Sequence, residues 1–233
     1  MKRLINKSAV IGIALMLLMM PQSNAQEVMA ALQKVQDTYS QLTDMKAEMS
    51  IAAYVNEEEE TPYYTQNAKI DKKGDLFYYQ MGDIEGLVNK EYNFWVDHQS
   101  KQINGGLRTQ DDQKKVNEAV MFDVEKTLAK YDKVVLVDTE GALSHYRIFS
   151  ADQMIKQTDL WIDADHLVRK LVYHYNEAMV GSNSRVEIKF LIFDKHPRMS
   201  ASAFSESRFV KKVNGEWRAG KAYPNYKVLF NPQ

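Results

Sequence analysis

Two segments of the chain have apolar residues at the spacing of an amphipathic helix. In residues 27–43 the apolar positions lie three or four residues apart, so they share one helical face. These positions are Val28, Leu32, Val35, Tyr39 and Leu42. The same spacing returns between residues 108 and 131, in Val116, Val120, Val124 and Leu128. The pattern therefore predicts a helix over each of the two segments.

A two-residue period begins directly after the first of these segments. Over Met45–Val55, apolar residues alternate with Lys46, Glu48 and Ser50. Alternation of this kind is typical of a β-strand with one buried face. A loop is expected to follow at Glu57–Glu60, because four adjacent carboxylates lack the spaced geometry of a cation site.

Most of the remaining chain has the composition of short strands. A hairpin is expected over residues 63–81 with its turn at 72–75, and a further strand over 91–97 is followed by a turn. The other expected strands cover residues 133–137, 143–150, 158–162, 167–175, 185–193, 207–213 and 216–221. Asn214-Gly215 is the strongest turn pattern, because both residues tolerate the positive φ of a tight hairpin.

The order of these elements predicts an α+β fold built on a large antiparallel sheet. Strands joined by short turns are mostly antiparallel, and no linker rich in Gly, Ser or Pro divides residues 26–233 into two domains. Pro224 and Pro232 argue against a central strand near the end of the chain. Several strands have apolar residues on both faces, which favours a strongly curved sheet, an unclosed half-barrel with helices covering its concave side.

Residues 1–25 have the pattern of a secretory signal peptide. Three basic residues (Lys2, Arg3 and Lys7) precede the apolar run Ala9–Met20, and small residues at Ser23-Asn24-Ala25 predict cleavage after Ala25. The run is shorter than the roughly 20 residues of a membrane-spanning helix. We therefore expect a mature chain without a transmembrane anchor, located in the periplasm or secreted from the cell.

The net charge of the chain bears on the class of partner that it can bind. Loss of the three basic residues of the leader leaves 27 Lys and Arg against 31 Asp and Glu, a net charge of −4. A mildly acidic protein is unsuited to neutralising a phosphate backbone, so nucleic acid is not expected as a partner. The chain has no Cys, so the stability of an exported protein of this size must come from core packing.

Two stretches resemble the outer-membrane lipoprotein carrier family and its relatives, the LolA-like superfamily. Residues 91–97 with Lys101 are similar to the aromatic strand and turn of that family, and residues 159–163 with 167–171 are similar to its central hairpin. The resemblance implies a single LolA-like domain over residues 26–233, in which an open barrel holds an apolar cavity. It also implies a non-enzymatic carrier or binding protein for lipid or for the acyl chains of a lipoprotein.

Ten apolar residues on the expected strands are candidates for the wall of such a cavity. They are Phe77, Tyr79, Tyr92, Phe94, Trp161, Leu171, Tyr173, Val186, Ile188 and Phe190. Several of them must point to the other face, because a two-residue period does not say which face is inside. The alternative is a packed core on the same scaffold, which would make the chain an envelope protein–protein interaction module that uses aromatics such as Trp217 and Tyr226.

Motifs of catalysis, metal binding and cofactor binding are not found in the sequence. The five His residues have no metal-ligand spacing, and the chain lacks a thiol, a Gly-x-Ser-x-Gly turn and a Gly-rich phosphate loop. We therefore expect no metal site, no cofactor and no enzymatic activity.

Overall fold

The computed structural model describes residues 20–118, 132–150, 153–182 and 184–231. Its first half contains a long helix, a run of strands and a short helix. These are α2 (Met20–Ser40), β1 (Asp44–Tyr54), β2 (Tyr64–Lys73), β3 (Leu76–Met81), β4 (Ile84–Val88), β5 (Tyr92–Asp97), β6 (Gln102–Leu107) and α3 (Gln110–Glu118).

The second half is dominated by strands. They are β7 (Lys133–Glu140), β8 (Leu143–Phe149), β9 (Ile155–Ile162), β10 (Val168–Tyr175), β11 (Arg185–Asp194), β12 (Val210–Val213), β13 (Glu216–Ala219) and β14 (Lys227–Asn231). Between them lie the short helix α5 (Glu177–Val180) and the 3-10 turns η1 (Ala201–Phe204) and η2 (Glu206–Arg208).

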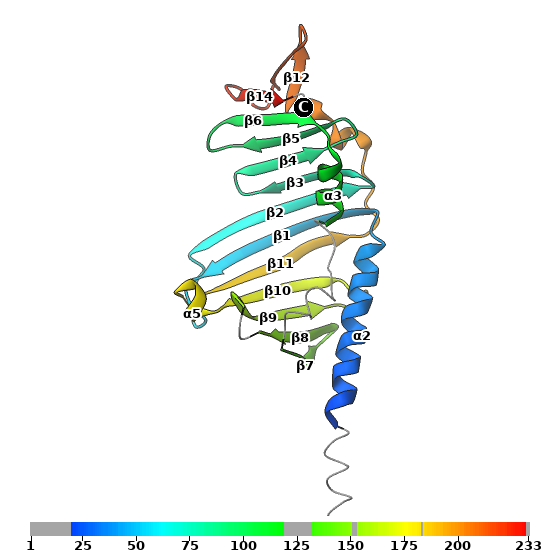
Figure 1. The fold of residues 1–233 in the computed structure, drawn as a ribbon, viewed down its shortest axis with the longest axis vertical. Helices are drawn as coiled ribbons and strands as arrows, with labels where there is room; N and C mark the ends of the chain where they lie inside the picture. The colour runs from blue at the N-terminus through cyan, green and yellow to red at the C-terminus, as the bar shows by residue number, and fades with distance from the viewer. Residues whose placement is uncertain (1–19, 119–131, 151–152, 183, 232–233) are drawn as a thin grey trace, which may run out of the picture.

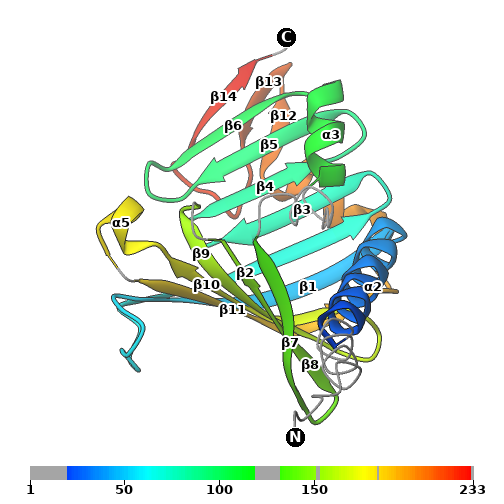
Figure 2. The same cartoon turned by 60° about the horizontal axis from the view of Figure 1, so that its bottom comes forward.

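One sheet of 12 strands organises the described part of the chain. Its order is β14-β6-β5-β4-β3-β2-β1-β11-β10-β9-β8-β7, and β12 and β13 form a separate hairpin (Figure 1). Neighbouring strands are antiparallel except β14, which pairs in parallel with β6. The sheet curls without closing, and α2 and α3 lie on its concave side (Figure 2). The predicted α+β half-barrel is confirmed.

The concave core forms where α2 packs against the curved sheet. Val28, Leu32 and Val35 lie on one face of the helix and are almost fully buried. They share a cluster with Met45 of β1 and Val116 of α3. The predicted helical face is thus the face that contacts the sheet, and burial of such side chains is the main term that stabilises this contact.

A lysine anchors the end of α2 to the sheet. The ammonium group of Lys72 donates hydrogen bonds to the carbonyl oxygens of Leu42 (3.0 Å) and Thr43 (3.1 Å), directly after the helix. Burial lowers the pKa of Lys72 below its ordinary value. Lys46, the basic residue of β1, does not take part in this anchor and forms an ion pair with Glu48.

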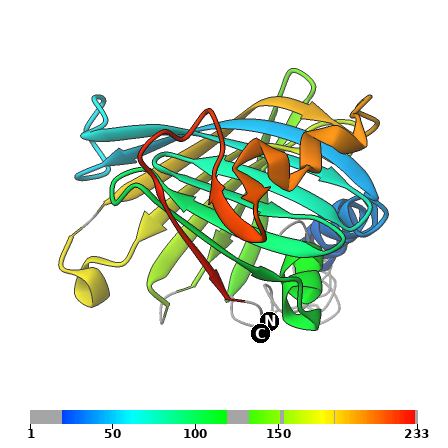
Figure 3. The ribbon, with the colours of Figure 1, turned by 90° about the horizontal axis from the view of Figure 1, so that it is seen from above.

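The convex face is covered by residues 199–226, which we call the C-terminal cap (Figure 3). The cap residues Phe204, Phe209 and Tyr223 pack on a patch of buried residues from β3 to β6. The patch consists of Tyr78, Leu87, Phe94, Val96 and Ile103. The cap therefore gives the convex face a second hydrophobic core.

A buried carboxylate fastens the cap to the sheet. Glu85 of β4 accepts hydrogen bonds from the hydroxyls of Tyr78 (2.8 Å) and Tyr223 (3.0 Å), and its other contact is the Nε2 atom of His98 (2.8 Å). Burial, together with the adjacent Glu85, raises the pKa of both tyrosines above the ordinary value, so their hydroxyls remain donors.

The structure differs from the sequence prediction at several elements. The sequence does not predict β4, and it predicts only Gln102 and Ile103 of β6. The reason is that Gly86 in β4 and the two glycines of β6 favour turns. Gly105 in fact leaves room for the ring of Phe94, since a Cβ there would lie 2.3 Å from that ring. The predicted turn at 72–75 is shorter, because β2 continues through Lys73. A 3-10 turn occupies part of the strand expected over 207–213.

Helix and chain ends also differ from the prediction. α2 starts at Met20, inside the segment assigned to the leader. Of the second predicted helix, Val116 is buried in α3, whereas Val120, Val124 and Leu128 lie outside the described residues. β14 lies between the two prolines of the chain end, at an edge of the sheet.

Replacement of Leu32 tests the contact between α2 and the sheet. Leu32 is 0% exposed, so Leu32→Ala should lower the free energy of unfolding by about 2–5 kcal/mol. Met29→Ala is the matched control, because Met29 lies on the same helix but is 46% exposed, and it should change stability by about 0.5 kcal/mol or less. Urea unfolding measures both, and equal losses would contradict this packing.

Candidate functional site

Strand register arranges the concave side chains of β3 to β6 in rows. One row, beside α3, contains Phe77, Val88 and Asn93, each paired with the next across the strands. The next row, which we call the aromatic row, contains Tyr79, Gly86, Trp95 and Asn104 in the same order of strands. Because paired residues point to the same face of a sheet, each row forms one band across the concave side.

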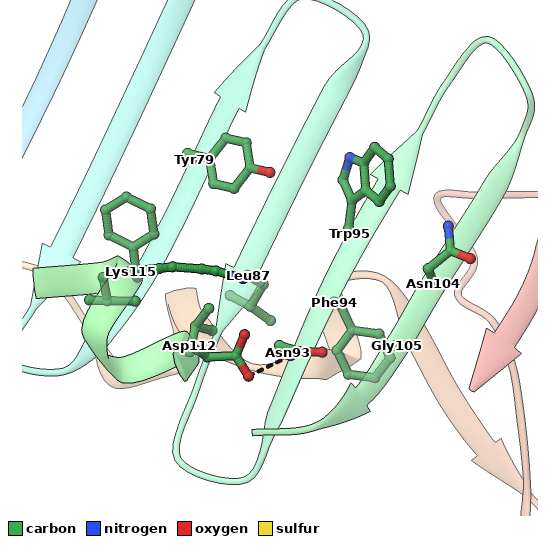
Figure 4. A pocket seen from close by; sticks show the side chains of 12 residues that line it. Tyr79, Leu87, Asn93, Phe94, Trp95, Asn104, Gly105, Asp112 and Lys115 are labelled. Carbon is green, nitrogen blue, oxygen red and sulfur yellow. Dashed lines mark hydrogen bonds between the residues drawn. The ribbon is translucent and has the colours of Figure 1, made fainter. Parts of the chain in front are cut away.

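A pocket of about 560 Å³ lies between these rows and α3 (Figure 4). Phe77, Val88 and Val116 provide its apolar lining on the concave side. The other lining residues are Tyr79, Leu87, Asn93, Phe94, Trp95, Asn104, Gly105, Asp112 and Lys115, of which Leu87 and Phe94 belong to the convex core. Its volume lies within the roughly 300–1,000 Å³ of pockets that bind small ligands.

A glycine makes room for one wall of the pocket. A Cβ on Gly86 would lie 2.0 Å from the ring of Tyr79, so any larger residue at this position would displace that ring. Burial raises the pKa of Tyr79, which keeps its hydroxyl protonated and able to donate a hydrogen bond. The Gly86 position therefore determines how Tyr79 lies in the pocket.

One polar contact joins α3 to the sheet above the pocket. The amide nitrogen of Asn93 on β5 donates to the carboxylate of Asp112 over 2.6 Å. The same carboxylate accepts from the backbone N–H and the hydroxyl of Thr109, both at 2.8 Å, which fixes the start of α3. We call this set of three residues the α3 latch.

The latch is held by a charged aspartate. Burial alone would raise the pKa of Asp112, but the hydrogen bonds from Thr109 and Asn93 lower it below the ordinary 3.8. The contribution of the latch to stability is therefore present above the ordinary pKa of an aspartate. It is lost only as the pH falls through the lowered value.

The polar groups of the aromatic row have no partner within the described part of the chain. The hydroxyl of Tyr79, the indole N–H of Trp95 and the side-chain amide of Asn104 make no hydrogen bond with any described residue. Trp95 is 47% exposed, and Figure 4 shows Tyr79 and Trp95 facing each other across the pocket. Their donors and acceptors are available to a ligand.

Seven of the ten residues predicted from the sequence face the concave side. Phe77 and Tyr79 line the pocket. Leu171 and Phe190 pack against the concave core, beyond the reach of α3. Tyr173, Val186 and Ile188 are half-buried on β10 and β11, where register places them on the same face as Leu171.

The other three predicted residues lie on the convex face. Tyr92 and Phe94 pack against Trp217 of the C-terminal cap, with ring centroids 5.2 and 5.7 Å apart, although Phe94 also borders the pocket. Trp161 stacks on His145 at 4.1 Å. The sequence prediction did not include Trp95 or Asn104; the register between strands places them on the face of Phe77 and Tyr79.

A second polar cluster lies on the convex face of β8 to β10. Asp159 is 2% exposed and contacts His145 (2.6 Å), Arg147 (2.7 Å), Gln157 (2.6 Å) and His174 (2.9 Å). Burial alone would raise the pKa of Asp159, but hydrogen bonds from these four side chains lower it. Burial likewise opposes the charged form of His174, yet its contacts with Asp159 and with Glu57 raise its pKa. The cluster joins the loop after β1 to the sheet.

The described residues were also searched for metal-binding groups and for membrane-spanning helices. They contain no group of three or more His, Asp and Glu side chains arranged to hold a metal ion. No helix among them has both the length and the apolar content that a membrane crossing requires.

Loss of the α3 latch should loosen α3 locally. Asp112→Ala removes the carboxylate that accepts from Thr109 and leaves Asn93 without its acceptor, at a cost of about 1–3 kcal/mol. Amide hydrogen exchange in residues 113–118 should therefore become roughly 5- to 150-fold faster. Asp111→Ala is the control, since Asp111 is exposed in the same first turn of the helix. Equal exchange rates in the two variants would show that the latch does not hold α3.

Comparisons with known proteins give only distant structural matches. No protein-family model matches the chain, and no curated protein matches its sequence. An uncharacterized conserved protein from Thermus thermophilus is similar in structure, with 12% identity and a TM-score of 0.47 over 89% of this chain and 99% of that one.

Two further solved structures are similar at the same level. MucB has 12% identity and a TM-score of 0.45, over 84% of this chain and 66% of that one. A LolA superfamily protein from Nitrosomonas europaea has 7% identity and a TM-score of 0.34, over 78% of this chain and 98% of that one.

Proposed function

We propose that this chain is a non-enzymatic carrier or binding protein of the bacterial cell envelope. Its ligand is a lipid, or the acyl chain of a lipidated protein, held in the pocket beneath α3. The observation that carries the proposal is a largely apolar pocket of about 560 Å³ on the concave side of an open sheet, next to a helix that the α3 latch joins to β5.

The energetics of such a pocket suit a carrier. Burial of about 14 methylene groups, at ~0.8 kcal/mol each, gives a gross gain of ~11 kcal/mol. Association costs of ~4–15 kcal/mol offset much of this gain. The balance is a moderate affinity, which allows both uptake and release.

The histidines of the convex cluster support a non-enzymatic role. Both ring nitrogens of His174 contact carboxylates, Glu57 at 2.5 Å and Asp159 at 2.9 Å. His145 contacts Asp159 through Nε2, and its Nδ1 lies 3.6 Å from Asp138. The ring of His174 therefore has no nitrogen free to accept a proton from a substrate.

An envelope location follows from the start of the sequence. The basic start, the apolar run and the small residues before position 26 form the pattern of a secretory signal peptide. We propose that the mature chain acts in the periplasm and that its partners are lipid, lipidated proteins or other envelope proteins. Its net charge of −4 argues against nucleic acid.

The second candidate is an envelope protein–protein interaction module. Exposed apolar side chains around the loop between β1 and β2 favour it, namely Val55 (55%), Tyr63 (68%) and Tyr64 (49%). The sequence suggested Trp217 and Tyr226 as residues of such an interface. In the structure they contact other residues of the chain: Trp217 packs against Tyr92, and the hydroxyl of Tyr226 contacts His98.

A variant that fills the pocket tests the proposed function. Val88 lines the pocket, so Val88→Trp should occupy the space and lower the uptake of a fluorescent fatty acid at least about tenfold. The native chain, exported and purified without detergent, should release near-stoichiometric acyl lipid into organic solvent, as measured by mass spectrometry. The variant should release much less.

The control places the same bulky residue on an open surface. Leu191→Trp suits this purpose, because Leu191 is 64% exposed on β11 and does not line the pocket. This variant should take up the fatty acid like the native chain. A native chain that carries no lipid and takes up no fatty acid would favour the interaction module.

A further inference from the structure

We propose that the aromatic row is a subsite for a polyhydroxylated head group, such as a hexose, on the amphiphile whose chain occupies the apolar part of the pocket. This inference rests on the proposed function and assigns the chemical class of its ligand. Four residues, Tyr79, Gly86, Trp95 and Asn104, form the subsite.

The pocket is divided into two chemically different parts. Beside α3, Phe77, Val88 and Val116 form an apolar surface that suits a hydrocarbon chain, next to the Asn93–Asp112 contact and Lys115. One row further from α3, the lining changes to two aromatic rings and an amide. Adjacent strands are about 4.8 Å apart, so the row from β3 to β6 is long enough to hold one sugar ring.

The exposed indole is the central element of the subsite. Trp95 is 47% exposed within the pocket lining, although an aromatic ring of this size is usually better buried. One face of a hexose ring consists of C–H groups and stacks on a flat aromatic surface, while its hydroxyls project from the edge. An open indole face therefore fits a sugar ring better than a bare acyl chain does.

The unpaired polar groups beside Trp95 match hydroxyls. A sugar hydroxyl both donates and accepts, as do the amide of Asn104 and the hydroxyl of Tyr79. Asn104 lies directly opposite Trp95 in the register, and Tyr79 lies on the other side, two strands away. A stacked ring would therefore have a hydrogen-bonding partner at each end.

The charges of the pocket disfavour an anionic head group. Lys115 is the one cationic residue among the lining residues, and Asp112 lies three positions before it on α3. The two charges interact with each other, because Lys115 lowers the pKa of Asp112. A phosphate or carboxylate would meet no unbalanced positive charge, whereas an uncharged sugar needs none.

Three amphiphiles with the same dodecyl chain separate these alternatives. Dodecyl maltoside, dodecanoate and dodecylphosphocholine are titrated below their micellar concentrations into the exported chain, and binding is measured by calorimetry. The maltoside should bind about tenfold or more tightly than either of the others, because stacking and two hydrogen bonds are added to the same chain.

Two variants test whether the subsite causes the higher affinity for the maltoside. Trp95→Leu and Asn104→Leu should each lower the affinity for the maltoside about tenfold and leave that for dodecanoate nearly unchanged. Met81→Leu is the control, since Met81 is 45% exposed on β3 but does not line the pocket. It should bind all three amphiphiles like the native chain.

The outcomes separate this inference from the proposed function. Equal affinities for the three amphiphiles, or tightest binding of dodecylphosphocholine or dodecanoate, would overturn the sugar subsite and leave the lipid-binding function standing. A maltoside preference that survives both substitutions would also overturn the subsite. Binding of none of the three would overturn the proposed function and this inference with it.

Discussion

The fold depends on one constraint: the curved sheet has apolar side chains on both faces, so each face needs a cover. On the concave side, α2 contributes Leu32 and Val35 to a core that includes Val116 of α3. On the convex side, the C-terminal cap buries Phe204 and Phe209 against β3 to β6. Burial at both faces supplies the hydrophobic stabilisation that a chain without disulfides requires.

The two covers contact the sheet in different ways. The cap is fastened through the buried Glu85 and its tyrosine and histidine partners. α3 meets β5 through the Asn93–Asp112 hydrogen bond, and its described part contributes Val116 to the concave core. Space for a ligand remains between α3 and the strands, which is what a protein that takes up and releases an amphiphile needs.

Periodicity predicted most of the elements but not the site. The helical face from Val28 to Tyr39 is buried as the pattern indicates, and the Asn214-Gly215 turn has positive φ at both residues. β6 was largely missed, because the fit of Gly105 under Phe94 is a contact between strands that local composition does not contain. A two-residue period likewise defines two faces without saying which is concave, so Trp95 was passed over in favour of its neighbours.

Photocrosslinking tests the central claim most directly. A fatty acid that carries a diazirine at the end of its chain is bound to the exported protein, irradiated, and located by peptide mass spectrometry. If the acyl chain lies in the pocket beside α3, we expect labels on its apolar lining, at Phe77, Val88 or Val116. Labels confined to the exposed apolar residues of the convex face, such as Leu191, would contradict it.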